Sequence, residues 1–253
     1  MPLALVRDLH LYYELHGAGE PLVLVNGALD TIESDWEQHL PAFAARYRVL
    51  AYDHRGHGRS DNPSGRFTGY DELAEDLAAL LDTSGIARAH VCGFSDGAMT
   101  LVTFALRWPE RVRALILAGA QYTNDERTLS LLDKMTPEQI EARRPAWAAK
   151  LEQLHDHHHA RGYWKALLRQ MLPFWRVQPD FSLDQLGQIA APVLLVAGER
   201  DGFGHLDQQV AMRRAIPRAE LCIAPNAGHF VMADQSDLFR LVTLDFLQRC
   251  GDA

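Results

Sequence analysis

The stretch Val91-Cys92-Gly93-Phe94-Ser95-Asp96-Gly97-Ala98 decides the fold. It has the pattern Gly-x-Ser-x-Gly, directly after an apolar run typical of a strand and directly before a segment with helical spacing. A serine on so sharp a turn has strained backbone angles, and side chains at Gly93 and Gly97 would collide there. The pattern therefore predicts a turn that projects the Ser95 hydroxyl above a sheet as a nucleophile. The alternative is a Gly-rich turn with an incidental serine.

On both sides of this turn, short apolar runs alternate with longer amphipathic stretches. The run Leu22–Val25 is continuous and apolar, as expected of a strand buried on both faces. We expect strands at residues 3–6, 9–15, 22–25, 48–52, 89–94, 112–118, 193–197 and 220–224, and helices at 35–46, 70–81, 96–106, 207–215 and 235–249. The alternation predicts parallel βαβ units in a layered α/β fold, with a mostly parallel central sheet flanked by helices.

Residues 121–186 interrupt this alternation with helical segments and no convincing strand. We expect them to form a helical lid inserted into a core made of residues 1–120 and 187–253. Such insertions lie at the carboxyl ends of the strands, where α/β sheets bind ligands. Aromatic side chains there favour a bulky or apolar substrate, although they could simply pack the lid on the core. The predicted substrate-binding aromatics are Tyr122, Trp147, Trp164, Trp175 and Phe230.

A serine hydroxyl needs a base, and the order along the chain in this architecture is serine, acid, histidine. Asp201 follows the strand expected at 193–197, and His229 lies in a loop after the next strand, so both reach the same end of the sheet. We therefore expect Ser95, Asp201 and His229 to form a catalytic triad. Glu199 is the competing acid, but it lies closer to its strand. Taken alone, His229 could be an ordinary loop histidine.

Acyl transfer also needs donors for the oxyanion. One is the backbone N–H of Asp96, next to the nucleophile and at the start of a helix, where developing negative charge is favoured. The second is expected from the loop after the early buried strand, with Ala28 as the candidate. The alternative for that loop is a plain turn.

These motifs together resemble the α/β-hydrolase superfamily over nearly the whole chain. The residues that carry the resemblance are Asn26-Gly27-Ala28, Asp53-His54-Arg55-Gly56-His57-Gly58-Arg59-Ser60, the Ser95 turn, Gly198-Glu199-Arg200-Asp201 and Gly228-His229. Asn26 stands where the superfamily usually has the histidine of a His-Gly dipeptide. No histidine can therefore act at that position, but the backbone donor is kept.

Within the superfamily, Gly-Phe-Ser-Asp-Gly-Ala is similar to the nucleophile turn of valacyclovirase-like (biphenyl hydrolase-like) enzymes, and residues 29–36 and 119–126 also look like that group. Serine-dependent macrolide esterases share the Ser-Asp-Gly turn. The resemblance implies that Asp96 binds an ammonium group near the scissile ester or lactone. The alternative is that Asp96 only caps the start of its helix, where carboxylates are favoured in any case.

Composition limits the classes of partner. The chain has 253 residues, 47% of them hydrophobic, and a formal charge of -8, which argues against a nucleic-acid or anionic-membrane partner. Its three cysteines have no paired spacing, so we expect neither a disulfide framework nor a zinc site. The N-terminus does not have the pattern of a signal peptide and no apolar run is long enough to span a bilayer, so a cytoplasmic location is expected.

The other histidines are not expected to do chemistry. Consecutive histidines at 157–159 cannot all face one ion from a helix, and with His155 they are interpreted as a solvated lid segment. His54 and His57 are expected to shape the Gly-rich loop, and His54 could reach the rim of the pocket. Cys92 lies on a buried strand and is expected to be core.

The sequence thus predicts a serine esterase acting on a small-molecule ester or lactone through an acyl-enzyme, with no metal or cofactor. Rivals on the same fold are a lactonase and an amide hydrolase resembling proline iminopeptidases. A non-catalytic binding protein of this fold would not need Ser95, Asp201 and His229. A haloalkane dehalogenase or epoxide hydrolase would need a carboxylate in place of Ser95.

Overall fold

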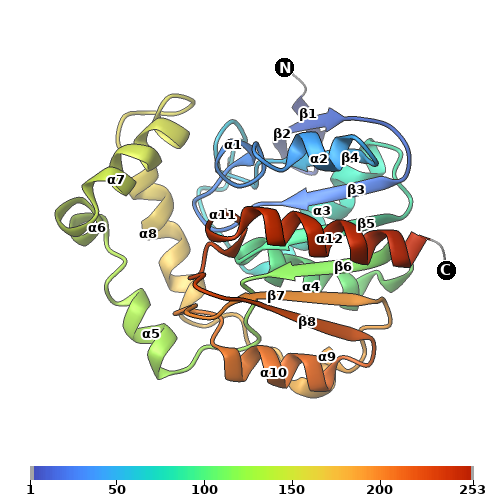
Figure 1. Ribbon diagram of the computed structural model, residues 1–253. Helices are drawn as coiled ribbons and strands as arrows, with labels where there is room; N and C mark the ends of the chain where they lie inside the picture. Colours follow the sequence, from blue (N-terminus) through green and yellow to red (C-terminus); the bar gives the residue numbers. More distant parts are fainter. Residues whose placement is uncertain (1–2, 252–253) are drawn as a thin grey trace.

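The computed structural model describes residues 3–251, in which eight strands form one sheet in the order β1-β2-β4-β3-β5-β6-β7-β8 (Figure 1). The strands are β1 (Leu3–Val6), β2 (Leu9–His16), β3 (Pro21–Val25), β4 (Arg48–Tyr52), β5 (Ala89–Phe94), β6 (Val112–Ala118), β7 (Val193–Gly198) and β8 (Ala219–Ala224). β1 and β2 run antiparallel to their neighbours, and the other six strands are parallel. The predicted α/β-hydrolase fold, with its mostly parallel sheet, is confirmed.

Helices cover both faces of this sheet (Figure 1). Outside the segment between β6 and β7, they are α1 (Ile32–Asp35), α2 (Leu40–Ala44), α3 (Tyr70–Thr83), α4 (Asp96–Arg107), a 3-10 turn at Pro109–Arg111, α10 (Leu206–Ala215), α11 (Val231–Asp234) and α12 (Ser236–Gly251). α3, α4 and α10 pack on one face, and α2 and α12 pack on the other. The side chains of β3 alternate between the hydrophobic cores on the two faces. Val23 and Val25 pack in the core under α3, α4 and α10, and Leu22 and Leu24 pack in the core under α2 and α12. A strand buried on both faces has to be apolar throughout.

The prediction of a single helix at residues 35–46 is wrong, because the chain forms two short helices in this region. α1 ends at Asp35, and α2 begins at Leu40 with Pro41 in its first turn. Proline has no N–H and favours the first turn of a helix, whereas in the interior it removes a hydrogen bond and crowds the preceding turn, so the chain starts a new helix next to Pro41. The break leaves Asp35 at a helix end, where its side chain faces the loop after β3.

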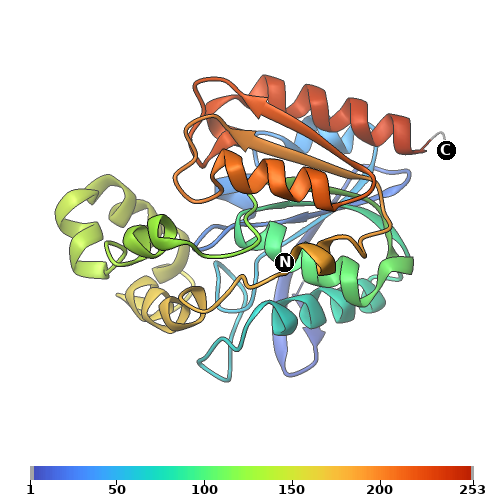
Figure 2. The same cartoon turned by 90° about the horizontal axis from the view of Figure 1, so that it is seen from below.

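Between β6 and β7 the chain leaves the sheet and forms α5 (Glu126–Leu132), α6 (Pro137–Arg143), α7 (Pro145–Leu151), a π-helical turn at Glu152–Asp156 and α8 (Tyr163–Trp175). We call residues 121–182 the insertion. Its helices gather at one side of the sheet in both views (Figures 1 and 2). The two ends of the insertion are joined by a bridge between Thr123 and Asp180. α9 (Leu183–Leu186), which follows, packs on α10 and α4 of the core.

No helix within residues 3–251 is long and apolar enough to cross a membrane.

Candidate active site

Ser95 lies on the turn between β5 and α4 with φ of 49° and ψ of −118°, a conformation that is strained for a residue with a side chain. The glycines on either side are needed because the backbone is crowded. A Cβ on Gly93 would lie 2.6 Å from the carbonyl of Gly97, and a Cβ on Gly97 would lie 2.5 Å from the carbonyl oxygen of Asn26. The turn therefore holds the serine in a fixed, strained position at the carboxyl end of β5.

Ser95, His229 and Asp201 form one chain of hydrogen bonds. The Ser95 hydroxyl donates to Nε2 of His229 over 2.9 Å, and Nδ1 of His229 lies 3.0 Å from each carboxylate oxygen of Asp201. The carboxylate can only accept, so the His229 proton lies on Nδ1 and Nε2 is free to take the serine proton. Glu199 instead accepts a hydrogen bond from the backbone of Asn226 on the surface.

The surroundings of the Asp201 carboxyl favour its ionised form. Burial opposes its charge, but attraction to His229, the hydrogen bond from that ring and two backbone N–H groups together hold the pKa of Asp201 below its ordinary value. The N–H groups of Phe203 and Gly204 donate to the same oxygen over 2.8 and 3.1 Å. An ionised carboxylate behind the ring stabilises the imidazolium that forms when His229 accepts a proton.

The loop after β3, residues 26–31, is pinned by side chains of the core. Nε2 of His54 donates to the backbone carbonyl of Asn26 over 3.2 Å, and Asp35 accepts from the N–H of Gly27 over 2.8 Å. His54 is thus buried beneath this loop and does not reach the pocket rim. Within residues 3–251 the N–H of Ala28 has no hydrogen-bond acceptor. The N–H of Asp96, the first residue of α4, has no acceptor inside its helix.

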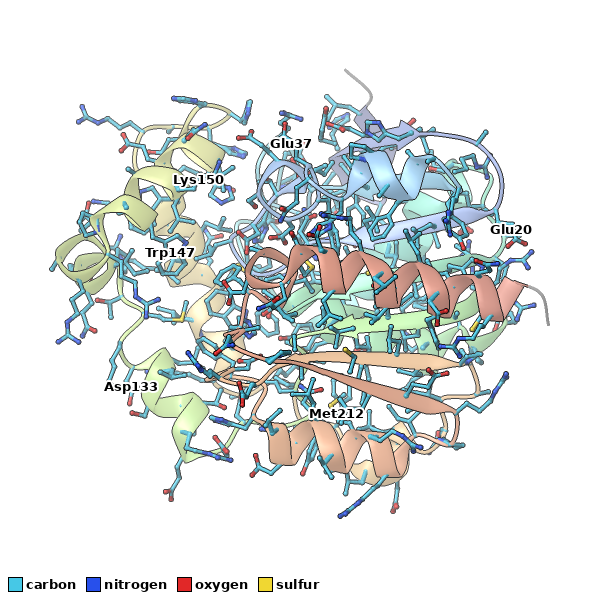
Figure 3. The ribbon with its side chains drawn as sticks, in the orientation of Figure 1. Glu20, Glu37, Asp133, Trp147, Lys150 and Met212 are labelled. Carbon is cyan, nitrogen blue, oxygen red and sulfur yellow. The ribbon has the colours of Figure 1, made fainter. Side chains whose placement is uncertain are left out.

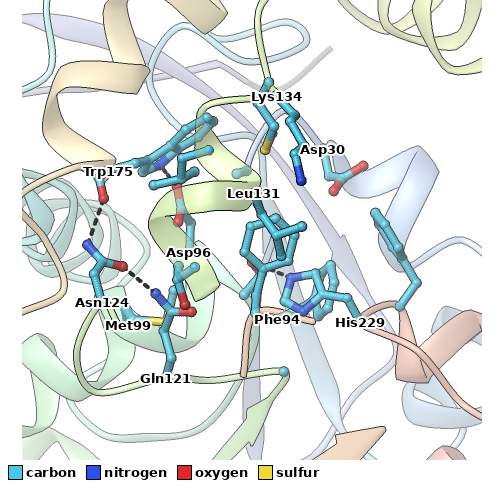
Figure 4. Close-up of a pocket in the computed structure, with 18 of the residues that line it drawn as sticks. Asp30, Phe94, Asp96, Met99, Gln121, Asn124, Leu131, Lys134, Trp175 and His229 are labelled. Atoms are coloured by element: carbon cyan, nitrogen blue, oxygen red, sulfur yellow. Dashed lines mark hydrogen bonds between the residues drawn. The ribbon is translucent and has the colours of Figure 1, made fainter. Parts of the chain in front are cut away.

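A cavity of about 360 Å³ opens above Ser95 between the core and the insertion (Figure 4). The predicted site residues Ala28, Ser95, Asp96, Trp147, Trp175, His229 and Phe230 line it. Figure 3 shows Trp147 on α7, facing inward from the insertion. The rest of the wall combines apolar side chains of the insertion, among them Leu131, Leu132, Met135 and Ile140, with the cations Lys134, Arg143 and Arg144. The apolar side chains of this wall suit an uncharged, apolar part of a ligand.

Two predicted substrate-binding aromatics do not line this cavity. Trp164 is buried in the hydrophobic core that α8 shares with the rest of the protein. Tyr122 packs against the same core, and its backbone bonds to Gln208 and Phe181 at the base of the insertion. The structure therefore does not place Tyr122 and Trp164 at the substrate pocket, because the packing of the insertion turns both rings away from the cavity wall.

Within residues 3–251 the Asp96 carboxylate bonds to two side chains and to no N–H group of its own helix. One carboxylate oxygen accepts from the Tyr70 hydroxyl over 2.9 Å. The other accepts from the indole N–H of Trp175 over 2.7 Å (Figure 4). Only 5% of the residue is exposed, and burial raises the pKa of Asp96 to about 6 against the lowering effect of these two bonds. Sequence reasoning missed Tyr70 and Trp175 as the partners that orient this carboxylate.

Asp30 is a second pocket carboxyl, which sequence reasoning also missed. It lies on the loop after β3 with 8% of its surface exposed and accepts one hydrogen bond, from the Ser34 hydroxyl over 3.1 Å. Burial raises its pKa to about 7. The signal was present in Asp30-Thr31-Ile32-Glu33-Ser34, a capping sequence at the start of α1, but most aspartates at helix starts are solvent-exposed.

The expectation of a solvated histidine segment is wrong for His155. Its side chain is fully buried, while His157 and His158 are exposed. His57 is buried beside it, with ring centres 5.8 Å apart, and shapes the Gly-rich loop. Within residues 3–251 no three His, Cys, Asp or Glu side chains are grouped to hold a metal ion.

A strained serine above a parallel sheet, bonded to a histidine and then to a buried carboxylate, is the arrangement of a hydrolase on an α/β scaffold. The chain belongs to the α/β hydrolase fold family, whose model matches residues 20–180. A second family model, described as TAP-like protein, matches residues 163–250.

Known relatives are similar along nearly their whole length. A protein of Azorhizobium caulinodans named "Putative carbamate hydrolase RutD" is 30% identical, with 100% of this chain and 99% of that protein covered. A 2-hydroxy-6-oxononadienedioate/2-hydroxy-6-oxononatrienedioate hydrolase of Paraburkholderia phymatum is 31% identical, with 95% and 91% covered. Among solved structures, the enol-lactonase of Burkholderia xenovorans LB400 has a TM-score of 0.78 at 25% identity, with 98% of this chain and 100% of that chain covered. The meta-cleavage product hydrolase of Pseudomonas fluorescens IP01 has a TM-score of 0.85 at 21% identity, with 98% of both chains covered.

Proposed function

We propose that the protein is a serine-dependent carboxylic ester hydrolase that works through an acyl-enzyme on Ser95. The observation that carries the proposal is the unbroken hydrogen-bond chain from Ser95 through His229 to Asp201, at the wall of a mostly apolar cavity. His229 takes the hydroxyl proton as Ser95 attacks the ester carbonyl, and then gives that proton to the departing alcohol. Water, deprotonated by His229, adds to the acyl-enzyme, and the acid leaves as Ser95 recovers its proton.

The oxyanion of each tetrahedral intermediate is held by the N–H groups of Ala28 and Asp96. Ala28 and Asp96 line the cavity together with Ser95, and within residues 3–251 neither of their N–H groups donates to another group. Preorganised donors of this kind stabilise charge that develops only in the transition state. The insertion acts as the lid over this site, which excludes water while the acyl-enzyme forms.

Substrates with a cationic group near the ester are favoured. The cavity is lined by two carboxyl groups, Asp30 and Asp96, and by three cations, Lys134, Arg143 and Arg144. The Asp96 carboxylate is bonded to the neutral Tyr70 hydroxyl and Trp175 indole, and within residues 3–251 it forms no ion pair. A buried carboxylate without a cation gains much from an incoming ammonium. A cavity of about 360 Å³ is at the lower end of ligand pockets, so aminoacyl esters suit it better than macrolide lactones.

A hydrolysis screen tests the bond and the substrate class together. We would compare short acyl esters, α-amino-acid esters, macrolides, an enol lactone, a carbamate and an amino-acid amide with wild-type protein. The proposal expects the α-amino-acid esters to have the highest kcat/KM. Preference for the enol lactone, the carbamate or the amide would assign the same triad to a lactonase, carbamate hydrolase or amide hydrolase, and no turnover of any of them would favour a binding protein.

Asp96→Ala is expected to lower kcat/KM on amine-bearing esters by about ten- to a hundredfold. A charge-assisted contact is worth roughly 1.5 to 3 kcal/mol, and each 1.4 kcal/mol is about tenfold. Neutral esters of the same size should change little, because alanine keeps the backbone N–H. The measurement is kcat/KM for an aminoacyl ester and its des-amino analogue with both proteins, and an unchanged ratio between the two substrates would sink amine recognition.

The preference for a cation is also expected to rise with pH. Burial raises the pKa of Asp96 to about 6 and that of Asp30 to about 7, so both carboxyls are largely neutral at pH 5 and charged at pH 8. Butyrylcholine keeps its charge throughout, and 3,3-dimethylbutyl butyrate is its neutral isostere. Their kcat/KM ratio should rise by about tenfold or more between these pH values, since titration of His229 affects both substrates alike. If this kcat/KM ratio stays constant between pH 5 and pH 8 and equals the ratio measured with Asp96→Asn, the carboxylates do not select the cation.

A further inference from the structure

His155 links the insertion to the loop that follows β3. It lies in the π-helical turn Glu152–Asp156, and none of its surface is exposed. The backbone N–H of Gly58 donates to its Nδ1 over 3.0 Å, and its Nε2 donates to the carbonyl of Leu29 over 3.0 Å. One ring therefore connects three segments that are far apart in the sequence.

The two partners fix the state of the ring. Because Nδ1 accepts from an N–H, the proton must lie on Nε2, which alone can then donate to a carbonyl. Burial lowers the pKa of His155 to about 4, against the raising effect of the Leu29 bond, so the ring stays neutral around pH 7. His155 is thus a rigid connector with one acceptor and one donor.

The bond to Leu29 is made at a strained point of the chain. Leu29 has φ of 59°, in the left-handed region that a leucine rarely adopts. It directly follows Ala28, whose N–H we assign to the oxyanion. The core holds the start of this loop through Asn26 and Gly27, as described above. The hydrogen bond from His155, a residue of the insertion, holds Leu29, which follows Ala28 in the loop.

We propose that His155 is a positioning residue that sets the direction of the Ala28 N–H, so that the oxyanion donors are aligned only while the insertion is docked on the core. This proposal rests on the proposed function. Two further contacts dock the same part of the insertion without touching residues 26–29. The Tyr163 hydroxyl donates to the carbonyl of Gly56 over 3.1 Å, and Lys150 on α7 (Figure 3) pairs with Glu33 over 3.2 Å.

Substitutions at His155 separate positioning from packing. In His155→Asn the amide keeps an acceptor near Gly58 but is too short to reach Leu29. The longer side chain in His155→Gln carries an acceptor and a donor on one planar group, as the wild-type imidazole does. Misplacing one oxyanion donor affects the transition state more than the bound substrate. We expect His155→Asn to lower kcat on a neutral ester by about ten- to a hundredfold with KM changed less than threefold, and His155→Gln to recover most of kcat.

Two controls show whether any loss is specific. His158→Ala removes an exposed histidine three residues away, and Tyr163→Phe removes a docking bond that does not involve the oxyanion loop. Both should keep kcat within about threefold of wild type, which is the scale of less than 1 kcal/mol. Thermal unfolding of each variant shows which of them remain folded.

The outcomes are distinct. The proposal is supported if the wild type is active, Ser95→Ala is inactive and His155→Asn has a lowered kcat. The proposal is overturned if His155→Asn has the same kcat as His158→Ala, if His155→Asn changes only KM, or if Tyr163→Phe loses as much kcat. None of these results contradicts the proposed esterase activity. If His155→Asn does not fold, His155→Gln decides, since a folded His155→Gln with kcat a hundredfold low overturns the proposal. Wild type inactive on every ester, or Ser95→Ala active, instead overturns the proposed function.

Discussion

Ser95→Ala is expected to lower kcat/KM for p-nitrophenyl acetate by roughly 10⁴- to 10⁶-fold, which is the scale for loss of a triad nucleophile. The physical reason is that the acyl group then has no oxygen to bind, and only the oxyanion donors and the cavity remain to assist attack by water. The fold should survive, because alanine is smaller and the turn keeps its glycines at positions 93 and 97. Initial rates with wild type and variant, together with thermal unfolding, provide the measurement.

The matched control is Ser64→Ala, on an exposed loop. It should retain full activity and full labelling by a fluorophosphonate, whereas Ser95→Ala should lose both. Wild-type turnover by a folded Ser95→Ala protein would show that the turn between β5 and α4 carries no nucleophile.

Asp201→Asn is expected to lower kcat by roughly 10⁴-fold if it behaves like other triad aspartates. The His229 ring now has Nδ1–H facing the carboxylate and Nε2 facing Ser95. An asparagine amide that donates to Nδ1 would favour the other tautomer, with the proton on Nε2, where it blocks transfer from the serine. KM should change far less than kcat, because Asp201 lies behind the ring and outside the cavity wall.

Glu199→Gln is the comparison for this variant, since Glu199 is the other acid after β7. Its carboxylate accepts a hydrogen bond from the backbone N–H of Asn226 at the surface, away from His229, so the substitution should cost less than about threefold. A large loss in Glu199→Gln together with a small one in Asp201→Asn would transfer the role of the acid to Glu199.

The sequence predicts the sheet and the triad because local patterns determine both. Strands buried on both faces have to be continuously apolar, and the Gly-x-Ser-x-Gly turn needs its two glycines whatever surrounds it. The two residues Asp201 and His229 were predicted to be close to Ser95 only because strands of a parallel sheet end at one edge. The broken helix at Pro41 was also visible in the sequence, since proline disfavours a helix interior and favours the first turn.

The cavity wall could not be predicted in the same way. Trp147 and Trp164 both lie on helices of the insertion, and only the packing of those helices turns one ring to the ligand and the other to the core. His155 was hidden by its exposed neighbours, because a π-helical turn changes the spacing at which side chains face inward. The Asp96 carboxylate is buried by tertiary contacts with Tyr70 and Trp175, which come from distant parts of the sequence.

The most direct test of the central claim is to trap the intermediate. Wild-type protein is mixed with p-nitrophenyl acetate, quenched in acid within the first turnover and analysed by intact and peptide mass spectrometry. The account predicts a mass increase of one acetyl group, located on the peptide that contains Ser95 and equal in amount to the initial release of p-nitrophenol. Release of p-nitrophenol with no acetyl group on Ser95, or with the acetyl group on another residue, would contradict it.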